Sequence, residues 1–245
     1  MKSNAIILFT RIPVPGETKT RLQPFLTMEE CCRLQKAFIQ DIHQVLGKVE
    51  TACDIIISYT PKGNLEDLKT LLPKSCLFSP QKGRDIGEKM HNAILHSLEA
   101  GYKKCILIGS DIPMLKEAVL DEAFVMLDNS DIVLCPTEDG GYYLIGMKEP
   151  CEEVFRLEYG ISTVFDKTLE AARAARKSCS VGECAMDIDE PCDLHRLRER
   201  LNETTNCPKT KTVLGELYRE RETSSKSNLG FPIASTENSK GHGSL

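Results

Sequence analysis

The alternation of short apolar runs with amphipathic stretches constrains the fold of this chain more than any other feature. Runs such as 5–8, 55–57 and 105–108 consist almost wholly of apolar residues, which is typical of strands buried on both faces of a sheet. Between them, apolar residues recur at three- and four-residue spacing, as they do on one face of a helix. Strands that alternate with helices pack as a sheet covered by helices. We therefore predict a three-layer α/β fold.

The pattern also places the elements. A capping box, Thr27 to Glu30, opens the longest helix. From residue 223, polar residues dominate without a period, so we expect one domain over 1–222 and a flexible tail over 223–245. The expected strands are 5–10, 54–59, 76–79, 104–109, 132–136 and 142–147, and the expected helices are 27–46, 65–72, 86–99, 116–127, 163–177, 192–201 and 212–221.

Charge and composition exclude several classes of partner. The net charge of −5 over 245 residues argues against a nucleic-acid or anionic-membrane binder, because both require a basic surface. No apolar run approaches the roughly 20 residues that span a bilayer, and we expect a cytoplasmic protein. The 11 cysteines include no C-x-x-C pair, so we expect reduced, mostly structural thiols. The spacing of Cys179, Cys184, Cys192 and Cys207 matches no common zinc pattern.

The loop after the first strand carries clustered positive charge. Arg11, Lys19 and Arg21 surround Gly16, and two prolines stiffen the loop. Backbone N–H groups and cationic side chains arranged in this way can hold a diphosphate. The loop is neither a Walker A nor a G-x-G-x-x-G motif. A solvated basic loop is the alternative interpretation, and in either case we expect truncation of Lys19 or Arg21 to cost little stability.

Carboxylates follow the later strands, where ligands bind in open α/β sheets. Asp111 ends the fourth expected strand, and Glu138 with Asp139 follows the fifth. Asp187 and Asp189 are two residues apart, hence on one side of an extended segment. Hard oxygen ligands of this kind suit Mg²⁺ or Mn²⁺. The alternatives are a helix cap for Asp111 and a plain Asp-Gly-Gly hairpin turn at 139–141.

Four segments, 9–22, 109–113, 138–146 and 187–191, occur here in the order found in one family. On these motifs the chain resembles bacterial GT-A-fold proteins assigned as glycosyltransferases, of the type associated with arsenosugar biosynthesis and radical-SAM neighbourhoods. The resemblance covers about residues 4–205. Nucleotidyltransferases that make phospholactate-guanosine and molybdenum-cofactor intermediates have similar loops and the same architecture. The resemblance implies a mostly parallel, mixed sheet of the nucleotide-diphospho-sugar transferase type.

The resemblance also implies roles for particular residues. Glycosyltransferases of this fold often carry D-x-D where this chain has Gly109-Ser110-Asp111, so the metal site lacks one ligand that Asp187 or Asp189 would supply. Asp139 is the expected catalytic base, with Glu138 second. The expected nucleotide- or phosphate-binding residues are Arg11, Gly16, Lys19, Arg21, Gly83 and Asp85; those beside the sugar or acceptor are Gly140, Gly141 and Tyr142; the metal ligands are Asp111, Asp187 and Asp189.

These features lead to three hypotheses. The first is a glycosyltransferase that uses Mg²⁺ or Mn²⁺ to move a sugar from a nucleotide-diphosphate sugar to a small acceptor. The second is a nucleotidyltransferase that couples a phosphorylated small molecule to a nucleoside triphosphate and releases pyrophosphate. The third is a binding or regulatory protein without turnover, which the incomplete D-x-D favours. The sequence contains no rule for the base, the sugar, the acceptor or the oligomeric state.

Overall fold

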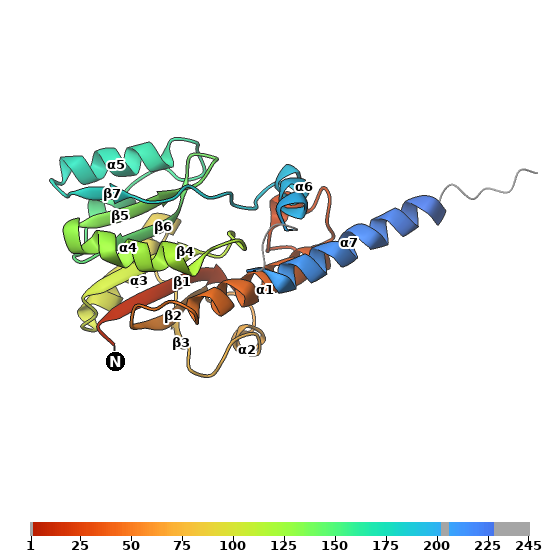
Figure 1. The fold of residues 1–245 in the computed structure, drawn as a ribbon, viewed down its shortest axis with the longest axis horizontal. Coiled ribbons are helices and arrows are strands. Elements are labelled where there is room, and N and C mark those ends of the chain that lie inside the picture. Colours follow the sequence, from red (N-terminus) through yellow and green to blue (C-terminus); the bar gives the residue numbers. More distant parts are fainter. Residues whose placement is uncertain (1, 202–205, 228–245) are drawn as a thin grey trace, which may run out of the picture.

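The computed structural model describes residues 2–201 and 206–227. Within these residues the chain forms a seven-stranded sheet in the order β3-β2-β1-β4-β6-β5-β7, with helices on both faces (Figure 1). Among these strands, β6 alone runs antiparallel to its neighbours. The predicted α/β fold with a mixed, mostly parallel sheet is confirmed. The strands are β1 (Asn4–Arg11), β2 (Cys53–Thr60), β3 (Leu77–Pro80), β4 (Lys104–Gly109), β5 (Ile132–Pro136), β6 (Tyr142–Met147) and β7 (Cys179–Val181).

The central strand β1 shows how the layers form. Successive side chains of a strand point to opposite faces, so Ile6 and Leu8 join one core cluster and Ala5 and Ile7 join the other. The helices α1 (Met28–Leu46), α2 (Leu65–Lys69) and α4 (Glu117–Asn129) cover the face of Ile6 and Leu8. The opposite face is covered by α3 (Ile86–Glu99), α5 (Val164–Ala174) and the 3₁₀ helix η2 (Glu152–Phe155).

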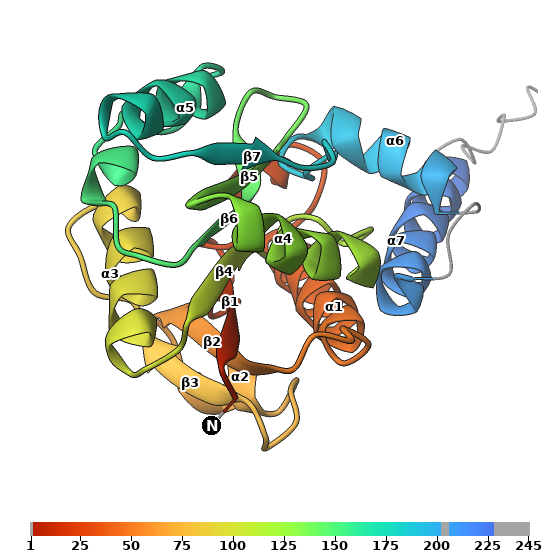
Figure 2. The ribbon, with the colours of Figure 1, turned by 60° about the vertical axis from the view of Figure 1, so that its left-hand side comes forward.

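A third apolar cluster lies on the far side of α1. The helix presents Ile39 and Ile42 to the sheet, and Leu34 and Phe38 to this cluster. The other contributors are η1 (Thr20–Leu22), α6 (Pro191–Arg200) and α7 (Pro208–Ser227), which lie beyond α1 in Figure 2. Because α1 is buried on two sides, it connects the sheet to the α6–α7 pair.

A buried carboxylate joins α1 to α7. Asp41, fully buried on α1, accepts hydrogen bonds from the backbone N–H groups of Lys209 (3.0 Å) and Thr210 (2.7 Å). The first N–H groups of a helix have no partner within it, and the N-terminus of a helix favours a negative charge. Asp41 therefore caps α7 from another helix.

The predicted elements lie close to the observed ones. The helices expected over 65–72 and 163–177 each end three residues earlier, and η1 and η2 were not expected. The short edge strand β7 was not expected, since its three residues carry no apolar pattern of their own. Helix α7 begins before and ends after the expected 212–221, and continues to Ser227. Residues 223–227, expected as tail, are thus helical, whereas 228–245 lie outside the described residues. In the described part of the chain, no helix is long and apolar enough to cross a membrane.

We expect Asp41→Ala to lower the free energy of unfolding by about 2–4 kcal/mol, because it leaves the buried N–H of Thr210 and the partly buried N–H of Lys209 without an acceptor. Urea denaturation followed by circular dichroism measures the change. Asp166→Ala, on the exposed side of α5, serves as the control and should change stability by about 0.5 kcal/mol or less. Equal effects of the two substitutions would contradict the capping role of Asp41.

Candidate active site

An extended segment, residues 182–189 and called the strap below, crosses the carboxyl ends of the strands. Its N–H groups donate to the carbonyl oxygens of Leu134, Pro136 and Asp111 at 2.9, 3.0 and 2.9 Å. The strap is therefore hydrogen-bonded to β5 and to Asp111, which follows β4. This backbone pairing brings Asp187 and Asp189 to Asp111, far away in the sequence.

Side chains of the strap alternate between its two sides. Met186 and Ile188 are buried in the third cluster, and Asp187 lies among other carboxylates. Burial raises the pKa of Asp187 to about 6, and the negative charges of Asp139, Asp111 and Asp189 contribute to the increase. The structure thus brings four of the predicted site residues into one acidic group.

Lys19 enters this acidic group from the loop after β1. Its ammonium lies 2.7 Å from Asp111 Oδ1, donates to the carbonyl oxygen of Ile188, and lies 5.5 Å from the centre of the Phe38 ring. The Lys19 side chain is only 4% exposed, and its backbone is left-handed with φ +49°. The premise of the expectation that truncation of Lys19 costs little stability is therefore wrong, because this side chain is buried and its ammonium contacts Asp111, Ile188 and Phe38.

The other cations of this loop remain at the surface. Arg21 forms an ion pair with Asp189, and its side chain is 61% exposed. This exposure is consistent with the expectation that truncation of Arg21 costs little stability. Arg11 is exposed at the carboxyl end of β1. Gly16 has φ +82° in the turn that leads to Lys19. The loop therefore presents two exposed guanidinium groups, and one buried ammonium, near the strand ends.

The turn between β5 and β6 uses Asp139 for its own structure. Oδ1 of Asp139 accepts hydrogen bonds from Thr137 Oγ1 at 2.5 Å and from the N–H of Gly141 at 3.0 Å. Gly140 has φ +90°, and a Cβ there would lie 1.9 Å from the carbonyl oxygen of Ser162. Tyr142 is half-buried and its hydroxyl lies 3.4 Å from that of Tyr159. The hairpin interpretation is correct for the backbone, and it places Asp139 beside Asp187.

Glu138, the second predicted base, is bound by α6. Arg196 forms an ion pair with it, and Arg200 Nη2 lies 3.6 Å from its Oε1. The hydrogen bond from Arg196 lowers the pKa of Glu138. Sequence reasoning missed both arginines, although their spacing of four residues, one helical turn, is visible in the sequence.

The segment before α3 is anchored to the sheet. Gln81 donates to the carbonyl oxygens of Thr10 and Ser58, both at 3.0 Å. Asp85 caps α3 by accepting from the N–H of Glu88 at 2.8 Å. Gly83 has φ +144°, and a Cβ there would lie 2.7 Å from the backbone nitrogen of Lys89. Asp85 thus has a structural role at the helix start, and nucleotide binding by Gly83 and Asp85 stays a prediction.

A buried polar network supports Asp111 from behind. Gln35 donates to Ser110 Oγ at 2.9 Å, and Thr10 Oγ1 lies 3.1 Å from the same oxygen. All three residues are buried. The network fixes the backbone next to Asp111, and a glutamine inside the apolar pattern of α1 is the sequence signal that could have identified it.

The carboxylates fit a divalent cation only in part. In residues 2–201 and 206–227, no three Asp, Glu, His or Cys side chains converge as ready ligands. Asp111 and Asp189 already contact Lys19 and Arg21. Carboxylate oxygens are ligands that suit Mg²⁺ or Mn²⁺. A bound cation would also relieve the repulsion between Asp187 and the neighbouring carboxylates. Asp187 therefore fits the predicted metal, whereas Asp111 and Asp189 fit it only if their ion pairs with Lys19 and Arg21 open.

Comparison with known proteins agrees with the motifs. A family of uncharacterized proteins conserved in bacteria, DUF2064, matches residues 43–159. A solved structure from Desulfovibrio desulfuricans G20, provisionally named a nucleotide-diphospho-sugar transferase, is 32% identical, with a TM-score of 0.82. The match covers 90% of this chain and 98% of that one. The chain belongs to the DUF2064 family. The predicted link to arsenosugar biosynthesis and radical-SAM neighbourhoods stays a prediction.

Other relatives carry a different activity in their names. A 2-phospho-L-lactate guanylyltransferase of Methanocaldococcus jannaschii is 28% identical over 200 residues, 79% of this chain and 83% of the relative. The enzyme with this name from Methanobrevibacter ruminantium is 26% identical over 231 residues, 89% of this chain and 94% of the relative. A 4-diphosphocytidyl-2C-methyl-D-erythritol synthase of Anaerococcus prevotii has a TM-score of 0.56 at 9% identity, covering 82% of this chain and 97% of that one, which shows the shared fold alone.

Asp187→Asn should stabilise the metal-free protein above pH 6 by about 2 kcal/mol and have a much smaller effect at pH 4, about 0.5 kcal/mol. The folded-state pKa is raised from 3.8 to about 6, so ionisation of Asp187 opposes folding, increasingly as the pH rises through that range. Urea denaturation in a chelator at both pH values measures the difference. The control Glu158→Gln is at an exposed site and should not reproduce this difference between the two pH values. An effect of Asp187→Asn that is the same at both pH values would contradict the raised pKa of Asp187.

Proposed function

We propose that this protein is a nucleotidyltransferase that couples a phosphorylated small molecule to a nucleoside triphosphate and releases pyrophosphate. Two comparisons support a transferase that acts on nucleotides. One is the 32% identity to the Desulfovibrio desulfuricans protein, and the other is the guanylyltransferase name of several relatives. These relatives favour the second hypothesis over glycosyl transfer. The choice between the two reactions rests on whether Asp139 or Glu138 is available as a base.

The observation that carries this proposal is that both predicted bases are engaged elsewhere. Asp139 Oδ1 shapes the hairpin turn, and Glu138 is paired with Arg196 and Arg200. Transfer to a hydroxyl group requires a positioned base to remove its proton. The phosphate of a phosphorylated substrate is already ionised near pH 7, since its second pKa is about 6. A phosphate nucleophile therefore suits this site better than a hydroxyl.

In this reaction an oxygen of the substrate's phosphate attacks the α-phosphorus of the nucleotide. A new P–O–P bond forms, the bond between the α-phosphorus and the oxygen that bridges to the β-phosphorus breaks, and pyrophosphate leaves with the bonding electrons. The chain would contribute positive charge along the phosphates. Arg11 and Arg21 are exposed at the strand ends and Lys19 lies between them, so these cations would bind the triphosphate and stabilise the charge of the leaving group.

Asp111 and Asp187 would hold the divalent cation. When bound, Mg²⁺ or Mn²⁺ neutralises charge on the phosphate oxygens. The hydrogen bond from the Ile188 N–H to the Asp111 carbonyl oxygen joins the two backbone segments that carry these carboxylates.

Glycosyl transfer is the second candidate. The Desulfovibrio desulfuricans relative with 32% identity is named for nucleotide-diphospho-sugars. Asp187, with a pKa of about 6, could accept a proton from an acceptor hydroxyl near neutral pH. A protein that binds nucleotide without turnover remains the third hypothesis.

The products decide between these functions. Incubation with each nucleoside triphosphate, a panel of phosphorylated hydroxy acids and Mn²⁺ should release pyrophosphate, detected by a coupled assay, and form a nucleoside diphosphate ester detected by mass spectrometry. A nucleoside diphosphate released from a nucleotide sugar would instead establish glycosyl transfer. Asp111→Asn serves as the low-activity control, because it removes a proposed metal ligand.

Asp111→Asn should also uncouple the metal from the nucleotide. In the wild type, Mn²⁺ and a nucleoside triphosphate should each raise the affinity for the other by the same factor, about tenfold or more. In the variant that factor should fall toward one, whereas Asp166→Asn should leave it unchanged. Isothermal titration of nucleotide with and without Mn²⁺ measures the factor. A variant that retains the full effect of Mn²⁺ would show that Asp111 is not a ligand.

A further inference from the structure

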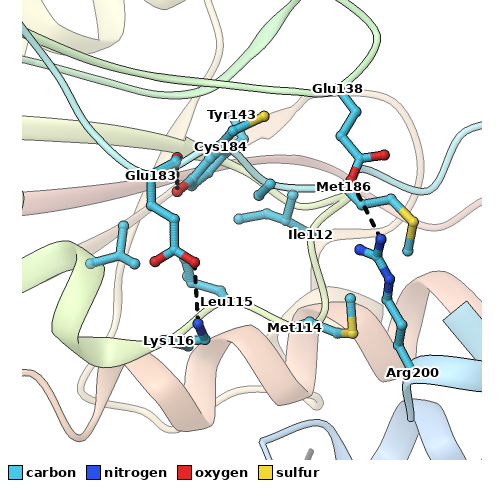
Figure 3. Close-up of a pocket in the computed structure, with 12 residues that line it drawn as sticks. Ile112, Met114, Leu115, Lys116, Glu138, Tyr143, Glu183, Cys184, Met186 and Arg200 are labelled. Carbon is cyan, nitrogen blue, oxygen red and sulfur yellow. Dashed lines mark hydrogen bonds and ion pairs between the residues drawn. The ribbon is translucent and has the colours of Figure 1, made fainter. Parts of the chain in front are cut away.

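A cavity lies behind the strap. It has a volume of about 340 Å³ and is lined by side chains of the segment from Ile112 to Val119, which leads into α4, by strap residues 183–186, and by Glu138, Tyr143 and Arg200 (Figure 3). Within the described chain it is separate from the acidic group, none of whose four members lines it. Nothing in the proposed reaction uses this space.

The interior of the cavity is apolar and small. Ile112, Leu115, Val119, Tyr143 and Met186 form much of its lining, and each of them is buried. Preformed apolar cavities of this size with a few polar groups at the edge are typical of small-molecule sites.

Two ion pairs lie on either side of the apolar residues in Figure 3. Lys116 Nζ lies 3.2 Å from Glu183 Oε1, and these side chains are 59% and 54% exposed. Tyr143 donates a hydrogen bond to the Glu183 carbonyl oxygen at 3.0 Å, which fixes the backbone there. The second pair, Glu138 with Arg200, is reinforced by Arg196. The Lys116–Glu183 pair is thus the weaker of the two and the easier one to open.

We propose that this cavity binds an apolar L-α-amino acid. Its carboxylate would lie on Lys116, its ammonium on Glu183, and its side chain among Ile112, Leu115 and Val119. An exposed ion pair contributes little to stability, so opening the Lys116–Glu183 pair costs little. The ligand then replaces one ion pair by two.

Charge complementarity favours a zwitterion over a simple anion or cation. The charged side chains at the cavity are two acids, Glu138 and Glu183, and two bases, Lys116 and Arg200. A ligand with a single charge would leave one member of the opened pair without a partner. A zwitterion whose ammonium and carboxylate are attached to the same carbon can pair with both members of that ion pair.

Binding there would also affect the acidic group. Ile112, Glu138 and Met186 line the cavity, and each is next in sequence to one of the carboxylates Asp111, Asp139 and Asp187. A ligand that shifts the strap therefore changes the positions of these carboxylates. This consequence rests on the proposed function, whereas binding of the amino acid does not.

Calorimetric titration of the full chain with L-leucine, L-isoleucine, L-methionine and L-phenylalanine tests the site. Leucine should bind, and three truncated probes should bind about tenfold more weakly or worse: glycine, which lacks the side chain, 4-methylpentanoate, which lacks the ammonium, and 3-methylbutylamine, which lacks the carboxylate. Absence of binding by all four amino acids at millimolar concentration would overturn the proposal. Equal affinity for leucine and 4-methylpentanoate would also overturn it, in favour of an organic acid site.

Matched variants locate the site. Val119→Phe should fill the cavity and abolish leucine binding, whereas Val125→Phe, at an exposed position on α4, should leave it unchanged. Thermal melting verifies that both variants fold. If Val119→Phe does not fold, Glu183→Gln provides the test, since it should weaken leucine about tenfold and leave 4-methylpentanoate no weaker. Unchanged leucine affinity in Glu183→Gln would overturn the proposed contact.

The effect on the acidic group is measured separately. Saturating leucine should change the affinity for the Mn²⁺–nucleotide pair, and the nucleotide should change the affinity for leucine by the same factor. Leucine binding without any change in nucleotide affinity would contradict the coupling. If no nucleotide binds at all, the proposed function fails, and the leucine titration still decides whether the cavity is a site.

Discussion

The contact between Lys19 and Asp111 holds together the three segments that make the site. A buried ammonium is costly unless charge and hydrogen bonds compensate it. Here Asp111 Oδ1, the Ile188 carbonyl oxygen and the Phe38 ring provide that compensation. Each partner comes from a different element: the end of β4, the strap and α1. Loss of the Lys19 charge would therefore loosen the loop, the strap and the strand end together.

The strap depends on the third apolar cluster as much as on its hydrogen bonds. Met186 and Ile188 pack with Leu34 and Phe38 of α1 and with residues of α6 and α7. The α6–α7 pair contacts the strap directly in this cluster, and because Asp41 on α1 caps α7, it is joined to the strap a second time through α1. The acidic group is thus positioned by packing on one side and exposes its carboxylates on the other. A carboxylate such as Asp187 can be held at an unfavourable position because its neighbours in the chain are firmly buried.

Most of the fold could be predicted because the strands are apolar runs bounded by turns. The strands β4, β5 and β6 occur over the predicted residues, since each run is apolar on both faces. In contrast, β7 has three residues and depends on its pairing with β5, which no local pattern shows. For the site, the sequence predicted only that charged residues lie at the ends of the strands. The burial of Lys19, the turn role of Asp139 and the pairing of Glu138 with α6 depend on contacts between segments remote in sequence, so the sequence suggested free groups where the structure has engaged ones.

The charge balance of the site explains why a metal and a nucleotide would be expected to bind together. Asp111 and Asp189 are already paired with Lys19 and Arg21, and Asp187 carries the remaining repulsion. A triphosphate alone would compete with these carboxylates for the same cations and leave them unpaired. A divalent cation alone would find Asp111 engaged by Lys19. When both enter, the phosphates can take the lysine and arginine, the carboxylates can take the metal, and every charge keeps a partner. In the proposed reaction, Lys19 would exchange Asp111 for a phosphate oxygen and keep its hydrogen bond to the Ile188 carbonyl oxygen.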